Sequence, residues 1–280
     1  MRCSERRLCS AQAFRIVCLA MALLGAACAA RRIDRAVAKA DALRGTQQYE
    51  AALKAYERIV LEYPTHPKIA EVLLRIGDLH HYTFADPERA AVAYQRIVTE
   101  WAWQPATSAA YRRLAELATG SDDHHAAINY YEQLLKYFPA HVERDVVRHL
   151  IGVSYFKQGQ YAQARIELRG LLERDDVRPE VRAKANYDLA ETYVAEHRSE
   201  AAIPYYERFV ADYPEGELTK QAQLQLLQCY AEAGEMAKAM ALEQTLRRQF
   251  PRDPVVQNRL QQVQKLRATV GRPGKLPWAH

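Results

Sequence analysis

One dipeptide recurs along the sequence at a regular interval. An aromatic residue is followed by proline at Tyr63-Pro64, Phe138-Pro139, Tyr213-Pro214 and Phe250-Pro251. The prolines are 75, 75 and 37 residues apart, so the repeating unit is about 37 residues long. Such a period indicates stacked copies of one supersecondary unit, because each copy buries its apolar face only against its neighbours. The 280 residues therefore do not form one or two ordinary globular domains, which the length alone would allow.

The interior of each unit follows a common pattern. In the clearest copy this pattern comprises Ile151, Gly152, Tyr155, Gly159, Tyr161, Ala164, Leu168 and Leu171. The sequence here resembles the tetratricopeptide repeat family. That family places an apolar-small pair and an aromatic in a first helix, then a turn glycine, then an aromatic and a small residue in a second helix. Other units match in part, and the resemblance covers residues 33–251.

The resemblance implies an all-α fold: a right-handed α-α superhelix (solenoid) of about six helix pairs. We expect the array to span residues 28–251, with a capping helix at 252–270 and a flexible tail at 271–280. One small residue recurs in each second helix, where the paired helices approach closely and a larger side chain would overpack the contact. These residues are Ala52, Ala90, Ala127, Ala164, Ala202 and Ala239.

Local signals predict several helix boundaries. Asp86-Pro87 offers an N-cap followed by proline at the first helical position, and one of residues 121–123 can cap the next second helix. Ser199 is a further candidate N-cap. Pro204 follows five residues later and predicts a bend or a late helix start, because proline removes a backbone hydrogen bond. The unit containing Gly77 has one residue inserted between its helices.

The N-terminus is typical of an export signal. Residues 1–15 are rich in arginine, and residues 16–30 form an uncharged apolar run of 15 residues. As a helix this run is about 22 Å long, short for a bilayer core of about 30 Å, so we expect a signal peptide at 1–27 rather than an uncleaved anchor. Ala27-Cys28-Ala29 suits ordinary signal peptidase. Leu24 to Cys28 resembles a bacterial lipobox, in which Cys28 is lipidated, although Gly25 stands where a branched apolar residue is usual.

Charge is distributed unevenly along the chain. The net charge is +5, but residues 247–280 carry eight basic residues and one acidic residue, a net +7, whereas residues 28–246 are −5. We therefore predict a basic surface on the capping helix at Arg259, Lys265 and Arg267, which either contacts an anionic partner or only covers the last repeat. Nucleic acid binding would need a broader basic stripe. Cys229 is the only cysteine after Cys28, so disulfides do not hold the array together.

In tetratricopeptide arrays the first helices line a concave groove that binds peptides. The family's groove positions correspond to Asp78, His81, Arg112, Glu116, His149, Val153, Phe156, Tyr187 and Glu191. Some members bind acidic C-terminal peptides through a Lys and Asn clamp in successive first helices. The matching positions here hold other residues, so a cytosolic chaperone adaptor is not expected. The alternative for each residue is ordinary solvated surface.

The sequence contains no familiar catalytic or cofactor motif. It lacks a His-Glu-x-x-His helix, a Gly-x-Ser-x-Gly elbow, a Gly-Lys-Ser/Thr phosphate loop and a Cys-x-x-Cys pair. Asp122, Asp123, His124 and His125 are adjacent in an expected turn, and neighbours on a turn seldom converge on one ion. We expect no metal, no cofactor and no enzymatic activity. A composition of 49% hydrophobic and 26% charged residues excludes a disordered chain.

Export signal and repeat array together predict a protein-protein interaction scaffold on the periplasmic side of a bacterial envelope, lipid-anchored to the outer membrane through Cys28. Its partners would be envelope proteins bound in the groove, with no nucleic acid. The sequence is similar to the lipoprotein of the β-barrel assembly machine and to the periplasmic coordinator of the Tol-Pal system, and both remain alternatives. A cell-wall enzyme or glycan-binding module is the alternative from another functional class.

Overall fold

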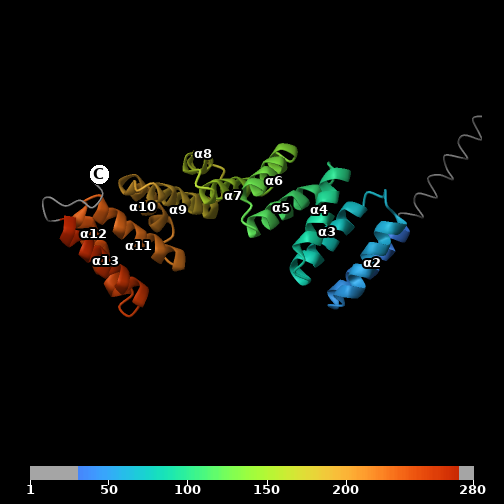
Figure 1. Cartoon of the computed structure of the whole chain (residues 1–280), viewed down its shortest axis with the longest axis horizontal. Coiled ribbons are helices and arrows are strands. Elements are labelled where there is room, and N and C mark those ends of the chain that lie inside the picture. Colours follow the sequence, from blue (N-terminus) through green and yellow to red (C-terminus); the bar gives the residue numbers. More distant parts are fainter. Residues whose placement is uncertain (1–30, 271–280) are drawn as a thin grey trace, which may run out of the picture. The chain divides into compact units, whose positions relative to one another are not determined.

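The computed structural model describes residues 31–270, and the side chains of residues 31–265. All regular structure in this part of the chain is helical, and it contains no strand. This part of the chain divides into two compact units, residues 31–117 (unit 1) and 118–270 (unit 2), with the boundary inside a helix. Within each unit, successive helices run back and forth (Figure 1). The prediction of an all-α repeat array is confirmed.

Unit 1 is built from short helices and one π-helical turn. Its described elements are a helix at 31–45, α2 (Tyr49–Glu62), α3 (Ile69–Asp78), the π-helix η1 (Leu79–Thr83), α4 (Pro87–Glu100) and the start of α5 (Pro105–Gly120). The pairs are 31–45 with α2 and α3 with α4. Here and below, the first helix of a pair is the N-terminal one.

Unit 2 continues the same architecture. It contains α6 (His124–Tyr137), α7 (Arg144–Lys157), α8 (Tyr161–Leu172), α9 (Pro179–Ala195), α10 (Ser199–Asp212), α11 (Glu217–Glu232), α12 (Met236–Gln249) and α13 (Pro254–Val270). Helices α7 and α8, α9 and α10, and α11 and α12 form pairs, and each helix packs against the next. Helix α13 lies within the stretch predicted to cap the array and packs on α11 and α12 through Val256, Leu260 and Val263.

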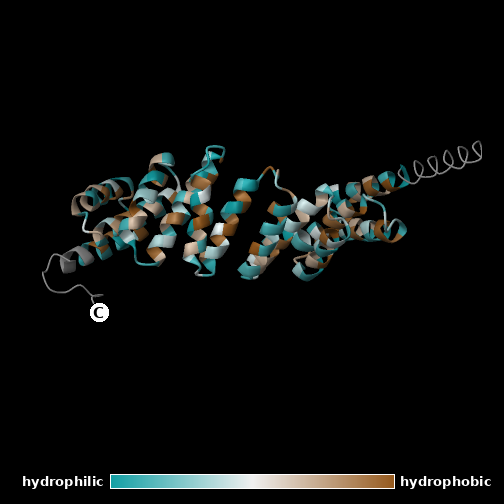
Figure 2. Ribbon diagram, turned by 90° about the horizontal axis from the view of Figure 1, so that it is seen from above, coloured by the Kyte–Doolittle hydropathy of each residue, from teal (hydrophilic) through white to brown (hydrophobic). Residues whose placement is uncertain are grey.

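The recurring alanines of the second helices lie in the core. Ala52, Ala90, Ala127, Ala164, Ala202 and Ala239 are all completely buried, as the predicted close helix contact requires. Four residues after the alanine, one helical turn on, most repeats place a large buried side chain that fills the space between helices. These residues are Tyr56, Tyr94, Tyr131, Leu168 and Tyr206. Each helix thus carries both hydrophobic and hydrophilic residues (Figure 2).

A left-handed residue stands in the turn before each helix that carries a recurring alanine, five residues before that alanine. These residues are Gln47, Ala85, Asp122, Gly159, His197 and Gly234, with φ between +52° and +78°. Side chains other than glycine pay a conformational cost in this region. The turn geometry is therefore imposed by the packing of the helices even where the local residue opposes it.

The predicted caps have mixed outcomes. Asp86 caps α4 by accepting a hydrogen bond from the Arg89 amide, and Asp123 caps α6 in the same way through the Ala126 amide. The Ser199 prediction is wrong: Arg198 holds the N-cap position and Ser199 is the first residue of α10, where its hydroxyl donates to Glu232. Helix α10 begins at Ser199 and contains Pro204 in its second turn, so the predicted late start is not observed. Proline at this position removes one backbone hydrogen bond of the helix.

The residue inserted in the second repeat is absorbed as the π-helical turn η1. The π-helical turn continues directly from α3 and carries His80, His81 and Tyr82, and Phe84 follows as its C-cap. Single π-turns commonly accommodate one extra residue within a helix. This insertion therefore leaves the packing of Gly77 on Tyr94 in register with the other repeats.

Candidate functional site

The predicted groove residues of unit 1 are tied to one another. Asp78 on α3 accepts a hydrogen bond from the Tyr94 hydroxyl at 2.8 Å and one from Arg113 Nε on α5 at 3.1 Å. The preceding repeat shows the same arrangement, because Asp41 accepts from the Tyr56 hydroxyl and pairs with Arg75 at 3.1 Å. Each acid therefore links its own second helix to the next first helix.

Arg112 and Glu116 belong to the same network. Arg112 Nε lies 2.9 Å from Glu116 Oε1, and Arg113 Nη1 lies 2.9 Å from Glu116 Oε2. Burial raises the pKa of Glu116, but the bonds from Arg113 and Arg112 outweigh it and hold the pKa below its usual value. Tyr82 also donates to Glu116, at 3.3 Å, and its ring lies under the Arg113 guanidinium. The first-helix face of unit 1 is thus an ionic lattice.

His81 lies at the edge of that lattice. It is half-buried in η1, and its ring meets Tyr82 edge-on at 4.3 Å. The structure brings Asp78, Arg112 and Glu116 together through Arg113, whereas the ring contact of His81 is with Tyr82.

The first-helix face of unit 2 has a different character. His149 on α7 pairs with Asp188 on α9, with 2.6 Å between Nε2 and Oδ2. Val153 and Phe156 follow His149 along α7 and are half-exposed, and Phe156 packs against Tyr161. Apolar and aromatic surface therefore takes the place of the ionic lattice of unit 1.

Tyr187 and Glu191 complete this face on α9. Tyr187 packs edge-on against Tyr206 and Phe209 at centroid distances of 5.8 and 5.4 Å, and burial followed by the charge of Glu191 raises its pKa. Glu191 accepts the Tyr206 hydroxyl. Among the described residues Glu191 has no ion pair, in contrast to Asp78 at the equivalent register in unit 1.

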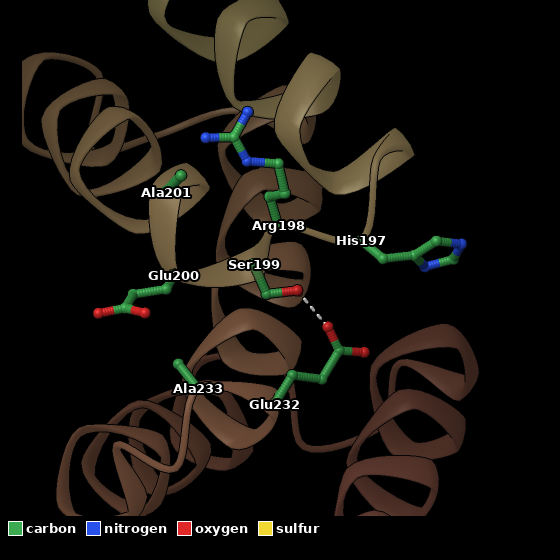
Figure 3. Close-up of a pocket in the computed structure, with 7 residues that line it drawn as sticks. All are labelled: His197, Arg198, Ser199, Glu200, Ala201, Glu232 and Ala233. Carbon is green, nitrogen blue, oxygen red and sulfur yellow. Dashed lines mark hydrogen bonds between the residues drawn. The ribbon is translucent and has the colours of Figure 1, made fainter. Parts of the chain in front are cut away.

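A cavity of about 960 Å³ opens at the turn between α9 and α10, beside the end of α11. Ser199 and Glu232 point toward each other there and are hydrogen-bonded, whereas Arg198 and His197 point elsewhere (Figure 3). The other oxygen of Glu232 accepts from Gln228 at 2.7 Å. Because the Ser199 hydroxyl is bound to a carboxylate rather than to an imidazole, this arrangement does not build a nucleophile-base pair. No sequence motif pointed to this cavity.

Only some of the remaining predicted site residues lie in the part of the chain that the structure describes. Arg259 is half-buried and donates to Gln228 at 2.5 Å, and Lys265 is exposed. Cys28 and the Arg267 side chain lie outside the described residues. Within the described part, no three His, Cys, Asp or Glu side chains are grouped as a metal site. No helix between residues 31 and 270 is both long and apolar enough to cross a membrane.

Sequence profiles of the tetratricopeptide repeat match residues 37–105 and 187–254, and a second profile of the same repeat matches residues 118–187. This protein belongs to the tetratricopeptide repeat family. The matched ranges contain the aromatic-proline pairs and all six buried alanines. Tetratricopeptide arrays typically act as non-catalytic scaffolds for protein-protein interaction, and the protein partners expected for this chain agree with that class.

Solved structures support the same fold. A tetratricopeptide repeat protein from Parabacteroides merdae ATCC 43184 is 16% identical, with a TM-score of 0.60, covering 85% of this chain and 90% of its own. PilW, a type IV pilus biogenesis factor, is 16% identical at a TM-score of 0.56, covering 83% and 98%. YrrB, described as having an unusual peptide-binding site, is 15% identical at 0.57, covering 76% and 99%. No curated protein matches the sequence.

Proposed function

We propose that this tetratricopeptide repeat protein is a non-enzymatic adaptor of a bacterial cell envelope, anchored to the outer membrane by lipid on Cys28 and facing the periplasm. One observation carries the proposal: an arginine-rich, apolar N-terminus with Ala26-Ala27-Cys28 directly precedes a protein-binding array. An array that is exported and tethered in this way binds its partners at the membrane surface.

The first-helix face of unit 2 is the surface we propose for the partner. In unit 1, Asp78, Arg113 and Glu116 neutralise one another, and a partner that covered them would have to desolvate the whole lattice. In unit 2, Val153, Phe156 and Tyr187 offer half-exposed apolar surface next to the carboxylate of Glu191. A peptide with an apolar side chain and a hydrogen-bond donor fits this arrangement best.

The structural neighbours are compatible with this role. PilW takes part in type IV pilus biogenesis and shares the fold over 83% of this chain. A likeness at 16% identity concerns the fold, so pilus, secretion and motility complexes define a class of candidate partners. The β-barrel assembly and Tol-Pal assignments remain alternative predictions.

Site-specific photocrosslinking tests the proposed face. Phe156 is replaced by benzoylphenylalanine in the full chain, and Val142, which is 93% exposed just before α7, is replaced in a matched control. We expect an adduct with one envelope protein from position 156 that is absent from position 142. Equal adducts from both positions, or none from position 156, would remove the first-helix face as the binding surface.

The enzymatic alternative has its own test. The purified chain is run on a zymogram containing peptidoglycan. No cleared band is expected, because the sequence carries no familiar catalytic motif, and a cleared band would overturn the scaffold proposal.

A further inference from the structure

Three contacts between successive helix pairs of unit 2, here called joints, use a tyrosine at the same register, three residues after Gly152, Ala190 and Leu227. These tyrosines are Tyr155, Tyr193 and Tyr230. The Tyr230 hydroxyl donates to Glu207, in the preceding second helix, at 2.7 Å, and Tyr155 hydrogen-bonds to Glu132 in the same way. At the middle joint the equivalent residue is Arg169, which donates to the Tyr193 hydroxyl. The partner of the tyrosine is therefore a cation at this joint and an anion at the other two.

Internal comparison of the repeats shows that the array does not require this reversal. At the register of Arg169 the other repeats hold Glu57, Gln95, Glu132, Glu207 and Gln244. One turn earlier, at the register of Arg165, they hold Leu53, Ala91, Ile128, Ile203 and Met240. Only the repeat of α8 places arginine at both positions. The other helix pairs pack with an apolar residue at the first position and an acidic or amide residue at the second. Packing of the helices therefore does not explain the two arginines.

The arginines gather around one buried ring. Tyr193 is 3% exposed, and the guanidinium carbons of Arg165, Arg198 and Arg169 lie 5.0, 5.1 and 5.8 Å from its centroid. The Tyr205 ring stacks on Tyr193 at 5.7 Å with an interplanar angle of 11°. Cation-aromatic contacts hold the three guanidinium groups in place. We call Arg165, Arg169, Arg198, Tyr193 and Tyr205 the arginine joint.

The positive charge of the arginine joint is only partly balanced. Glu196 is held by Arg165 through two bonds of 2.8 and 3.1 Å, and Arg198 reaches the same carboxylate at 3.5 Å. Among the described residues Arg169 has no ion pair, since its hydrogen bonds go to tyrosine hydroxyls. The joint thus holds three guanidinium groups and one paired carboxylate, although residues 118–246 as a whole carry 14 basic and 21 acidic residues, a net −7.

The excess charge is accessible to a partner. Arg169 is exposed, and the Arg198 side chain is 56% exposed. Ile166, three residues before Arg169 on α8, is 62% exposed and adds an apolar contact beside the cations. None of these residues belongs to the first-helix face described above.

We infer that the arginine joint binds the carboxylates of an acidic protein segment, with Arg169 and Arg198 as its ligands. The pairing of Arg165 with Glu196 already shows a guanidinium group of this joint gripping a carboxylate through two parallel bonds. The planar guanidinium fork suits carboxylates in this way. A segment of Asp or Glu next to an apolar residue matches both the free charge and Ile166. This surface is independent of the proposed first-helix face.

Arg169→Glu separates a binding role from a structural one. The substitution restores the residue type of Glu132 and Glu207, so the Tyr193 hydroxyl can donate to it as Tyr230 donates to Glu207. Arg208→Glu is the matched control, because Arg208 is an exposed arginine of the same unit with an i,i+4 pair to Asp212. Binding of the full chain to a fluorescein-labelled decapeptide of Asp, Glu and Leu is measured by fluorescence polarisation, with an Asn, Gln and Leu decapeptide as reference.

We expect the wild type to prefer the acidic peptide, Arg169→Glu to weaken that binding by roughly tenfold or more with an unchanged melting temperature, and Arg208→Glu to change it little. Equal binding of both peptides by the wild type, or equal losses in the two variants, would overturn the inference. Loss of binding together with a lowered melting temperature in Arg169→Glu would also overturn it, since Arg169 would then be part of the packing. Complete displacement of the peptide by millimolar inorganic phosphate would contradict a carboxylate site.

Discussion

Gly77→Ala tests the closest helix contact of unit 1. A Cβ added to Gly77 would lie 2.7 Å from Cδ1 and 2.8 Å from Cζ of Tyr94, well inside normal contact distance. Tyr94 is fully buried and its hydroxyl is bonded to Asp78, so the ring cannot move away without losing that bond. The substitution therefore forces either overpacking or the loss of a buried hydrogen bond.

The expected size follows from opposing effects. Overpacking a core costs about 1–3 kcal/mol, and an unsatisfied buried polar group costs a similar amount. Alanine regains about 1 kcal/mol over glycine in a helix interior. We expect Gly77→Ala to destabilise unit 1 by roughly 2 kcal/mol. Gly170→Ala in α8 is the matched control, because its added Cβ meets nothing within 4 Å, and it should leave stability equal or up to about 1 kcal/mol higher.

The assay is urea denaturation followed by circular dichroism, with hydrogen exchange of the peptides from α3 and α4. Exchange is needed because repeat arrays can unfold in parts, and the loss should be confined to unit 1. If Gly77→Ala proved as stable as Gly170→Ala, the described packing of α3 on α4 would be refuted.

Three further predictions concern stability and charge. Asp145 is buried, and two hydrogen bonds from the Arg178 side chain, above all, lower its pKa from 3.8 to about 2. The ionised Asp145 therefore stabilises the fold fully above pH 4, and this contribution is lost as the pH falls toward 2. Asp145→Asn should lower the free energy of unfolding by roughly 2 kcal/mol at pH 7. Measured by urea denaturation, the free energy of unfolding of the variant should also depend less on pH between 4 and 2 than that of the wild type, and an equal dependence would refute this role. Gly159→Ala should lower the free energy of unfolding by about 1–2 kcal/mol in the same assay. The added Cβ would meet no atom within 4 Å, but φ is +73°, a conformation that alanine disfavours, so an unchanged stability would refute this backbone argument. Replacing the exposed Arg248, Arg252 and Lys265 at the basic C-terminal end with Gln should weaken sedimentation with anionic vesicles at low salt more than at physiological salt, and equal sedimentation of both proteins would show that these three cations do not bind the membrane.

Much of the fold could be predicted because one physical constraint repeats. The alanines at the helix contact, the aromatic residues one turn later and the caps at Asp86 and Asp123 all follow from local spacing. The prediction failed where a residue distant in sequence formed the hydrogen bond that local spacing had assigned within a helix. Ser199 looks like an N-cap in sequence, yet Glu232, 33 residues away, takes its hydroxyl.

The candidate site was less predictable for the same reason. Register placed Asp78, Glu116 and Glu191 at equivalent first-helix positions, but their partners come from other helices. Arg113 reaches Asp78 across 35 residues, and Tyr206 reaches Glu191 across 15. The sequence held one usable signal for the arginine joint, namely Arg165 and Arg169 at positions where other repeats place apolar and acidic or amide residues. Whether each face binds a partner stays a prediction.

The most direct measurement is the intact mass of the chain extracted from bacterial membranes, with sequencing of its N-terminal peptide. The proposed envelope adaptor predicts an N-terminus at Cys28 carrying two or three acyl chains, which together hold a protein on a membrane far more strongly than one chain. It also predicts that Cys28→Ala releases the protein into the soluble periplasmic fraction. An unmodified Cys28, or a chain that retains residues 1–27, would contradict the lipid-anchored account.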